Sequence, residues 1–198
     1  MTERPAQASK LVGILALQGD FEAHAKIVGS LGARPREVRV PEDLEGLDAL
    51  IIPGGESTVM TLGIERECLA EPLRNLARQI PVLGTCAGMI MLDRDHLDVL
   101  DIRTSRNAFG RQLRSFESDI EVDGVQGGPV HAVFIRAPWV AEHGPEVEVL
   151  GRVDGHPVAV RQGNVVAVSF HPELSGETRL HRLLVASNGQ PSPLDRPA

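Results

Sequence analysis

A chain of 198 residues is long enough for one sizeable hydrophobic core and too short for two comfortable domains. The hydrophobic fraction of 42% and the charged fraction of 24% are ordinary for a globular protein, and no stretch approaches the ~18 apolar residues of a membrane span. A net charge of −7 argues against nucleic acid as the main partner, because phosphate binding requires clustered Lys and Arg.

The two ends of the chain differ in composition from the rest. Residues 1–9 are polar and lack the apolar centre of a secretory signal, and residues 188–198 are rich in Pro. We therefore expect a single domain over residues 10–187, loose termini and a cytoplasmic location. In that compartment the two cysteines, Cys68 and Cys86, are expected to stay reduced.

Strand and helix patterns alternate in the first half of the chain. Residues 10–17 form a continuous apolar run of the kind found in parallel strands that are covered on both faces. The patterns that follow predict helix 21–31, closed by Gly32, strands 36–40 and 47–52, helices 59–69 and 73–77, and a strand that begins at Val82. This rhythm predicts an α/β fold of three layers, with a mostly parallel sheet between helices on both faces.

The second half consists of short β-like segments separated by glycines. Asp154-Gly155 and Gln162-Gly163-Asn164 are typical of hairpin turns, so we expect antiparallel strands to extend the sheet. The predicted strands are 112–123, 130–135, 147–153, 157–160 and 165–170, and residues 178–187 are expected to close the domain as a helix.

Segment 81–92 joins an apolar strand, a tight turn and an apolar helical pattern. The turn Gly84-Thr85-Cys86-Ala87-Gly88 has the sequence form of a nucleophile elbow, in which small neighbours leave the nucleophile exposed at the end of a strand. The N-terminus of the following helix favours the thiolate form of Cys86. The alternative is a cysteine that serves only as a small buried hydrophobe. The elbow favours catalysis, provided that a base lies nearby.

His171 is the candidate base. It follows the apolar strand 165–170, so it also belongs at a strand end, and Glu173 points to the same side if the backbone stays extended through Pro172. Glu173 could then orient the imidazole and stabilise its cation. The remaining histidines are expected to be surface or structural residues: His24, His96, His131, His143, His156 and His181.

The turn after strand 47–52 is a candidate oxyanion hole. Ligands of such sheets bind beyond the carboxyl ends of the strands, where Pro53–Ser57 and the elbow both lie. Acyl chemistry needs main-chain donors, which the N–H of Ala87 and the Gly54-Gly55 pair could supply. Alternatively, this turn only caps the next helix, with Ser57 as the N-cap residue. As a nucleophile Ser57 is less attractive than Cys86, because it lacks the elbow frame.

Six motifs together resemble one family, the glutaminase subunit of pyridoxal 5′-phosphate synthase, which belongs to the class I (triad) glutamine amidotransferases. Two of the patterns, Gly-x-Cys-x-Gly and His-Pro-Glu, are shared by the whole superfamily. The motifs Arg106–Gln112 and Phe134–Pro138 point to this subfamily specifically. The resemblance spans residues 10–187. The motifs are Gly13–Gly19, Pro53–Ser57, Gly84–Gly88, Arg106–Gln112, Phe134–Trp139 and Ser169–Leu174.

The resemblance implies roles for individual residues. Cys86 would be the nucleophile, and His171 and Glu173 would complete the triad. Independently of the resemblance, we expect the main chain of Gly55 and Ala87 to form the oxyanion hole. The resemblance also implies glutamine contacts from Gly55, Glu56, Ser57, Arg106, Ile135 and Arg136. It implies no cofactor and no metal. One departure is that segment 92–106, which contains Asp93–His96, is shorter than expected for the family.

The expected reaction is hydrolysis of L-glutamine to glutamate and ammonia through a thioester. The chain has no room for an acceptor-binding domain, so a separate synthase subunit is expected, in a large hetero-oligomer. Two alternatives remain. One is the glutaminase subunit of another amidotransferase, such as the imidazole glycerol phosphate synthase type, and the other is a cysteine peptidase or a noncatalytic relative.

Overall fold

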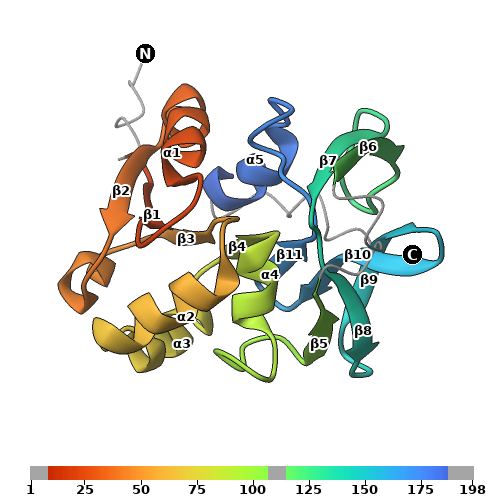
Figure 1. The fold of residues 1–198 in the computed structure, drawn as a ribbon. Helices are drawn as coiled ribbons and strands as arrows, with labels where there is room; N and C mark the ends of the chain where they lie inside the picture. The colour runs from red at the N-terminus through yellow and green to blue at the C-terminus, as the bar shows by residue number, and fades with distance from the viewer. Residues whose placement is uncertain (1–8, 107–114, 187–198) are drawn as a thin grey trace, which may run out of the picture.

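A seven-stranded sheet runs through the middle of the molecule (Figure 1). The computed structural model describes residues 9–106 and 115–186. The strand order is β2-β1-β3-β4-β11-β10-β9; the first five pair in parallel, and β10 and β9 join by antiparallel pairing. The strands are β1 (Leu11–Leu15), β2 (Arg34–Val38), β3 (Ala49–Ile52), β4 (Val82–Thr85), β9 (Glu148–Val153), β10 (His156–Gln162) and β11 (Val165–Val168).

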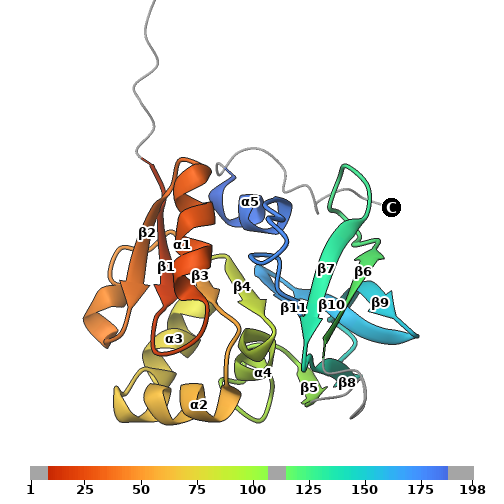
Figure 2. The same cartoon turned by 45° about the horizontal axis from the view of Figure 1, so that its top comes forward.

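Helices cover both faces of this sheet (Figure 2). Helices α1 (Phe21–Ser30) and α5 (Arg179–Val185) lie on one face. The other face carries α2 (Ser57–Arg66), α3 (Ala70–Ala77) and α4 (Ala87–Leu92), and a short 3-10 helix, η1 (Pro41–Leu44), follows β2. The predicted three-layer α/β fold is therefore confirmed.

The central strand β3 shows why the sheet needs cover on both sides. All four of its residues are fully buried. Ala49 and Ile51 pack into the core beneath α1 and α5, whereas Leu50 and Ile52 pack into the core beneath α2, α3 and α4. Side chains of a strand alternate between its faces, so a continuous apolar run fits only a strand with two apolar neighbours.

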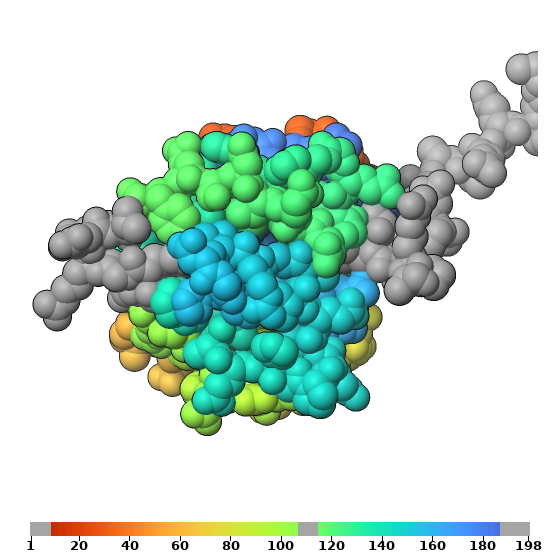
Figure 3. All heavy atoms as spheres, turned by 90° about the vertical axis from the view of Figure 1, so that its right-hand side faces the viewer, coloured from red at the N-terminus to blue at the C-terminus, as the bar shows by residue number. Residues whose placement is uncertain are grey.

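Two small antiparallel sheets complete the C-terminal half. Strand β6 (Ser115–Ile120) pairs with β7 (Val130–Ile135), and β5 (Ile102–Ser105) pairs with β8 (Trp139–His143). Figure 3 faces this end of the molecule, where residues of β6 and β7 lie next to those of β9 and β10.

The C-terminal half differs in two ways from the sequence-based prediction. Segments 112–123 and 130–135 were expected to extend the main sheet, but β6 and β7 form a separate ribbon that covers its α1–α5 face. Residues 112–114 lie outside the described part of the chain. Strands β5 and β8 were not predicted, because each contributes only one fully buried apolar residue and neither carries an alternating apolar pattern.

Local turn signals agree with the structure more closely. Asp154 and Gly155, at φ of +50° and +81°, join β9 to β10 as a two-residue turn, and Gly163 at φ +57° helps to join β10 to β11. Other boundaries shift by a few residues: β2 begins two residues earlier than predicted, and α2 ends three residues earlier. Among the described helices, none has both the length and the apolar character needed to cross a bilayer.

Candidate active site

Cys86 lies in a strained turn between β4 and α4. Its φ of +48° and ψ of −105° are rare for a residue with a side chain, and strain of this kind persists where the surrounding structure enforces it. A Cβ atom on Gly88 would lie 1.9 Å from the carbonyl oxygen of Ile52, so only glycine lets α4 pack this closely against the end of β3. The geometry is that of a nucleophile elbow.

His171 and Glu173 follow the neighbouring strand β11. Nδ1 of His171 lies 2.6 Å from Oε1 of Glu173, and both side chains are buried. The backbone from His171 forms a turn, with the N–H of Leu174 donating to the carbonyl of His171 at 3.2 Å, instead of the extended segment expected from the sequence. The tight turn still brings the carboxylate to the imidazole.

The site allows the ring of His171 to approach Cys86. A Cβ on Gly54 would lie 2.4 Å from Cε1 of His171 and 3.4 Å from Cβ of Cys86, so the missing side chain of Gly54 leaves the space that the ring occupies. In this arrangement Sγ of Cys86 also lies 3.8 Å from the carbonyl oxygen of Ile135.

His171 has an unusually stable cation. Burial lowers the pKa of His171, but its contacts with Cys86 and Glu173 outweigh burial and raise the pKa to about 10. An imidazolium between a sulfur and a carboxylate is the acid form that a leaving amine requires.

A cavity of about 410 Å³ opens over the elbow. It is lined by Cys86 and His171 and by all the residues that the resemblance implied as glutamine or oxyanion contacts. Glu173 is buried behind His171 and does not line it. The lining residues are Gln18, Asp20, Gly55, Glu56, Ser57, Thr58, Cys86, Ala87, Ile90, Arg106, Ile135, Arg136 and His171.

The N-cap of α2 is Glu56, and not Ser57 as predicted. The carboxylate of Glu56 accepts from the main-chain N–H groups of Thr58 and Val59, each at 3.1 Å. The N–H of Thr58 is the main cause of the lowered pKa of Glu56. A carboxylate at this position also suits the positive end of the helix dipole, which explains why it displaces the serine.

Gln18 is a pocket residue that the sequence singled out only as a member of the motif Gly13–Gly19. Its Oε1 accepts from the N–H of Glu56 at 2.6 Å and thereby ties the end of β1 to the turn before α2. Its position directly after a buried parallel strand was the available signal, because the carboxyl ends of such strands share one crevice. Asp20, in the same turn, also lines the cavity.

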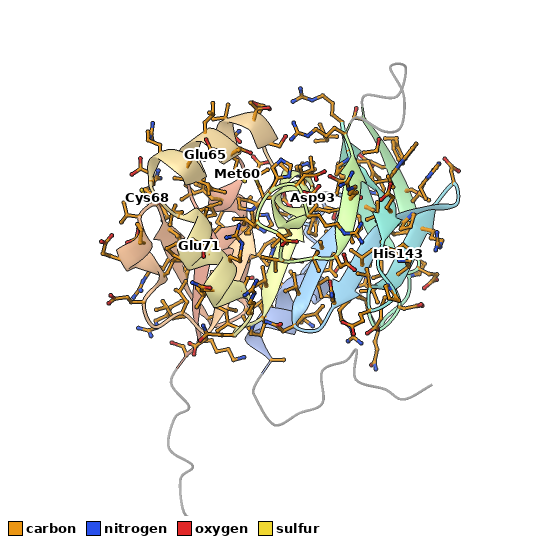
Figure 4. All side chains as sticks on the ribbon, turned by 90° about the horizontal axis from the view of Figure 1, so that it is seen from below. Met60, Glu65, Cys68, Glu71, Asp93 and His143 are labelled. Carbon is orange, nitrogen blue, oxygen red and sulfur yellow. The ribbon has the colours of Figure 1, made fainter. Side chains whose placement is uncertain are left out.

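Arg106 reaches the cavity from the short segment 92–106. Its Nη2 lies 3.0 Å from Nε2 of His96, and Nδ1 of His96 lies 2.7 Å from Oδ1 of Asp93. The other oxygen of Asp93 accepts from the hydroxyl of Thr104 at 2.6 Å. Figure 4 labels Asp93 near the centre of the molecule and Cys68 near its edge. Residues 107–112 of the predicted motif lie outside the described part of the chain.

Three side chains of the site could in principle hold a cation. Ligand atoms of Asp20, His171 and Glu173 all lie within 4.8 Å of one another. However, Nδ1 of His171 is already bonded to Glu173, and a cation there would displace the proton that this bond needs. The arrangement therefore suits acid–base chemistry better than metal binding.

Comparison with solved structures places this fold among the glutamine amidotransferases. A solved structure described as a glutamine amidotransferase is 48% identical, with a TM-score of 0.81 over 86% of this chain and 95% of that one. The structure of PurLQS from Thermotoga maritima, 17% identical with a TM-score of 0.65 over 86% and 93% of the two chains, shares the fold.

The sequence comparison defines the family. Residues 14–189 match the SNO glutamine amidotransferase family, and the chain belongs to it. A pyridoxal 5′-phosphate synthase subunit PdxT from Mycolicibacterium vanbaalenii is 52% identical over 89% of this chain and 96% of the relative. The corresponding protein of Frankia alni is 53% identical over 88% and 92%.

Proposed function

We propose that this chain is the glutaminase subunit of a pyridoxal 5′-phosphate synthase and hydrolyses L-glutamine to L-glutamate and ammonia. The observation that carries the proposal is that Cys86 on an elbow and His171, oriented by Glu173, line one cavity. Membership of an amidotransferase family and relatives above 50% identity named as PdxT support the same activity.

The first half of the reaction is acyl transfer to sulfur. The Cys86 thiolate attacks the side-chain amide carbon of glutamine, and main-chain N–H groups of Gly55 and Ala87 stabilise the oxyanion that forms. His171 then gives its proton to the amide nitrogen and the C–N bond breaks. Ammonia departs, and the acyl group stays bound to Cys86 as a thioester. The raised pKa of His171 keeps this proton available at neutral pH.

The second half is hydrolysis of the thioester. His171, now neutral, takes a proton from water, and the resulting hydroxide attacks the thioester carbon at the same oxyanion site. Collapse of this intermediate breaks the C–S bond, releases glutamate and restores the thiolate–imidazolium pair. The side chain of Glu173 stabilises the imidazolium through the 2.6 Å contact.

The substrate contacts are assigned to other residues of the cavity lining. Glutamine carries both a carboxylate and an ammonium group, and the cavity offers charges of both signs in Arg106 and Asp20. We assign substrate contacts to Gly55, Glu56, Ser57, Arg106, Ile135 and Arg136.

The ammonia requires a second protein. In bulk water it would be protonated and would lose its nucleophilicity, so it is useful only if an acceptor enzyme receives it directly. We propose that a pyridoxal 5′-phosphate synthase subunit docks on this chain, in a large hetero-oligomer. The cytoplasmic location expected from the sequence stays a prediction.

Release of glutamate from glutamine tests the proposal, with and without a purified synthase subunit. The wild-type chain should release glutamate, and Cys86→Ala should reduce the rate by at least about 10³-fold. Cys68→Ser is the matched control, because Cys68 is the exposed free thiol, outside the cavity, and its variant should stay active. Unchanged glutamate release by Cys86→Ala would refute the assignment of Cys86 as the nucleophile. Activation by a different synthase would favour another type of amidotransferase.

A further inference from the structure

A buried histidine pair lies behind the proposed triad, where α1 and α5 meet on the same face of the sheet (Figures 1 and 2). Nδ1 of His24 lies 2.8 Å from Nε2 of His181, and both residues are completely buried. The other ring nitrogen of His24, Nε2, lies 3.4 Å from Oε2 of Glu173 and 3.3 Å from the hydroxyl of Thr85. The pair therefore contacts the carboxylate on the side opposite His171.

Both rings are neutral. Burial, followed by the nearness of His181 and His171, holds the pKa of His24 well below its ordinary value. Burial likewise lowers the pKa of His181 to about 4. A neutral imidazole has one N–H donor and one acceptor nitrogen, so the contacts of each ring decide which nitrogen carries the proton.

The carboxylate decides the tautomer of His24. Oε1 of Glu173 is occupied by His171, whereas Oε2 is buried and has no aligned hydrogen-bond partner among the described residues. A lone pair on Nε2 of His24 would repel the ionised carboxylate, and an N–H on Nε2 would stabilise it. With the proton on Nε2, Nδ1 of His24 accepts from the Nε2–H of His181.

Two further groups bear on this assignment. The hydroxyl of Thr85, 3.3 Å from Nε2 of His24, can accept from an N–H there or donate to a lone pair, so it fits either tautomer. The main-chain carbonyl of Glu177 lies near His181, but Nδ1 of His181 makes no aligned hydrogen bond. In the assigned tautomers Nδ1 is an acceptor without a donor. The reverse tautomers would turn an N–H of His181 towards the Glu177 carbonyl but would leave a lone pair of His24 facing the ionised carboxylate of Glu173, and the repulsion from the full negative charge is the larger of the two effects.

We propose that His24 is a positioning residue of the glutaminase, which turns an Nε2–H towards Oε2 of Glu173 across the 3.4 Å contact and stabilises the carboxylate that orients His171. His181 holds His24 in the required tautomer. The inference rests on the proposed glutaminase function. It accounts for two buried imidazoles on a face of the sheet whose core is mostly apolar, where burial of a polar ring costs free energy that an aliphatic side chain would not lose.

The tautomer can be observed directly in the full-length chain. With ¹⁵N-labelled histidine, NMR should show His24 protonated at Nε2 and unprotonated at Nδ1, with resonances assigned from the His24→Gln variant. A His24 ring protonated at Nδ1 would overturn the proposal. This readout does not depend on activity, so it separates the inference from the proposed function.

Kinetics of two variants of His24 test the positioning role. His24→Leu fills the space without a donor, and we expect kcat for glutamine to fall about tenfold while KM changes less than about twofold. His24→Gln places an amide N–H near the position of Nε2 and should recover most of kcat. Equal kcat in the wild type and His24→Leu would refute the proposal, and so would equal loss in both variants.

Val28→Ala is the matched control for loss of packing. Val28 is fully buried one turn after His24 on α1 and belongs to the same core. We expect Val28→Ala to lower the midpoint of thermal unfolding at least as much as His24→Leu while keeping the wild-type kcat. A tenfold fall of kcat in Val28→Ala would show that activity follows general stability, and would overturn the positioning role.

Discussion

At the scale of single residues, the site depends on two features. The backbone holds Cys86 at a strained positive φ, and the sulfur of Cys86 and the carboxylate of Glu173 stabilise the cation of His171. Cys86 has a positive φ because glycines on either side allow β4 and α4 to meet sharply. His171 is placed between the sulfur and Glu173. The two groups come from turns that follow adjacent strands, β4 and β11.

The pKa values of His171 and His181 are shifted in opposite directions, so the two rings should titrate at opposite ends of the pH range. The pKa of His171 is raised to about 10, so its ring should keep the second proton from acidic pH until the pH approaches that value, whereas His181 should gain its second proton only near about 4. NMR titration of the labelled rings measures both. In Cys86→Ala the His171 midpoint should fall, because one cause of the raised pKa is gone. A wild-type His171 midpoint near the ordinary 6.5 would contradict the stabilisation of the His171 cation by Cys86 and Glu173.

The same shifts set opposite dependences of stability on pH. His171, with a raised pKa, contributes stability that is complete below 6.5 and is lost as the pH rises towards about 10. His181, with a lowered pKa, leaves the unfolded chain with more bound protons between 6.5 and about 4, so the free energy of unfolding falls as the pH decreases through that range.

Residue patterns predicted part of this site. Cys86 and His171 could be selected from the sequence because each follows an apolar strand, and the turn at 53–57 could be placed beside them for the same reason. His24 and His181 could not, since helical spacing shows that a residue is buried but not that α1 and α5 bring two imidazoles together behind β4.

At the scale of elements, the connection from α4 to β5 shows how a short segment can still serve the site. Its Asp93–His96 bond holds Arg106 at the mouth of the cavity, and Thr104 on β5 fixes Asp93. The pattern of residues could not predict this chain of contacts, because the contacts link a loop to Thr104 on β5, a strand that the sequence pattern did not reveal.

His96→Leu should weaken glutamine binding through this connection. The variant removes the acceptor that holds Arg106, so we expect KM for glutamine to rise about fivefold with little change of kcat, the loss of one charge-assisted hydrogen bond. His143→Leu is the control, because His143, labelled in Figure 4, lies on β8 and does not line the cavity, and its ring lies 3.1 Å from the adjacent Gly144 carbonyl. Equal KM in both variants would refute the role of His96.

At the scale of the whole molecule, the order of elements places every proposed catalytic group beyond the carboxyl ends of the central strands β3, β4 and β11. The alternation of strands and helices predicted the parallel half and the helices on both faces. It could not predict that β6 and β7 leave the main sheet, because an alternating pattern shows which residues face a core and not which strand is the partner.

A glutaminase that acts alone would waste its substrate, so we expect a docked synthase to control the rate. Addition of a purified synthase subunit should raise kcat for glutamine hydrolysis at least about tenfold at saturating glutamine. In the complete system with the acceptor substrates, less free ammonia than glutamate should appear. A rate that is independent of the synthase would contradict coupling between the two proteins.

The central claim is that the sulfur of Cys86 attacks glutamine with the help of His171. A diazoketone analogue of glutamine, which alkylates a nucleophile that binds and attacks it, tests this most directly when the labelled chain is digested and mapped by mass spectrometry. One adduct on Cys86 is predicted, prevented by excess glutamine and strongly slowed by His171→Ala. An adduct on Cys68 or Ser57 instead, or equal labelling in the His171 variant, would contradict it.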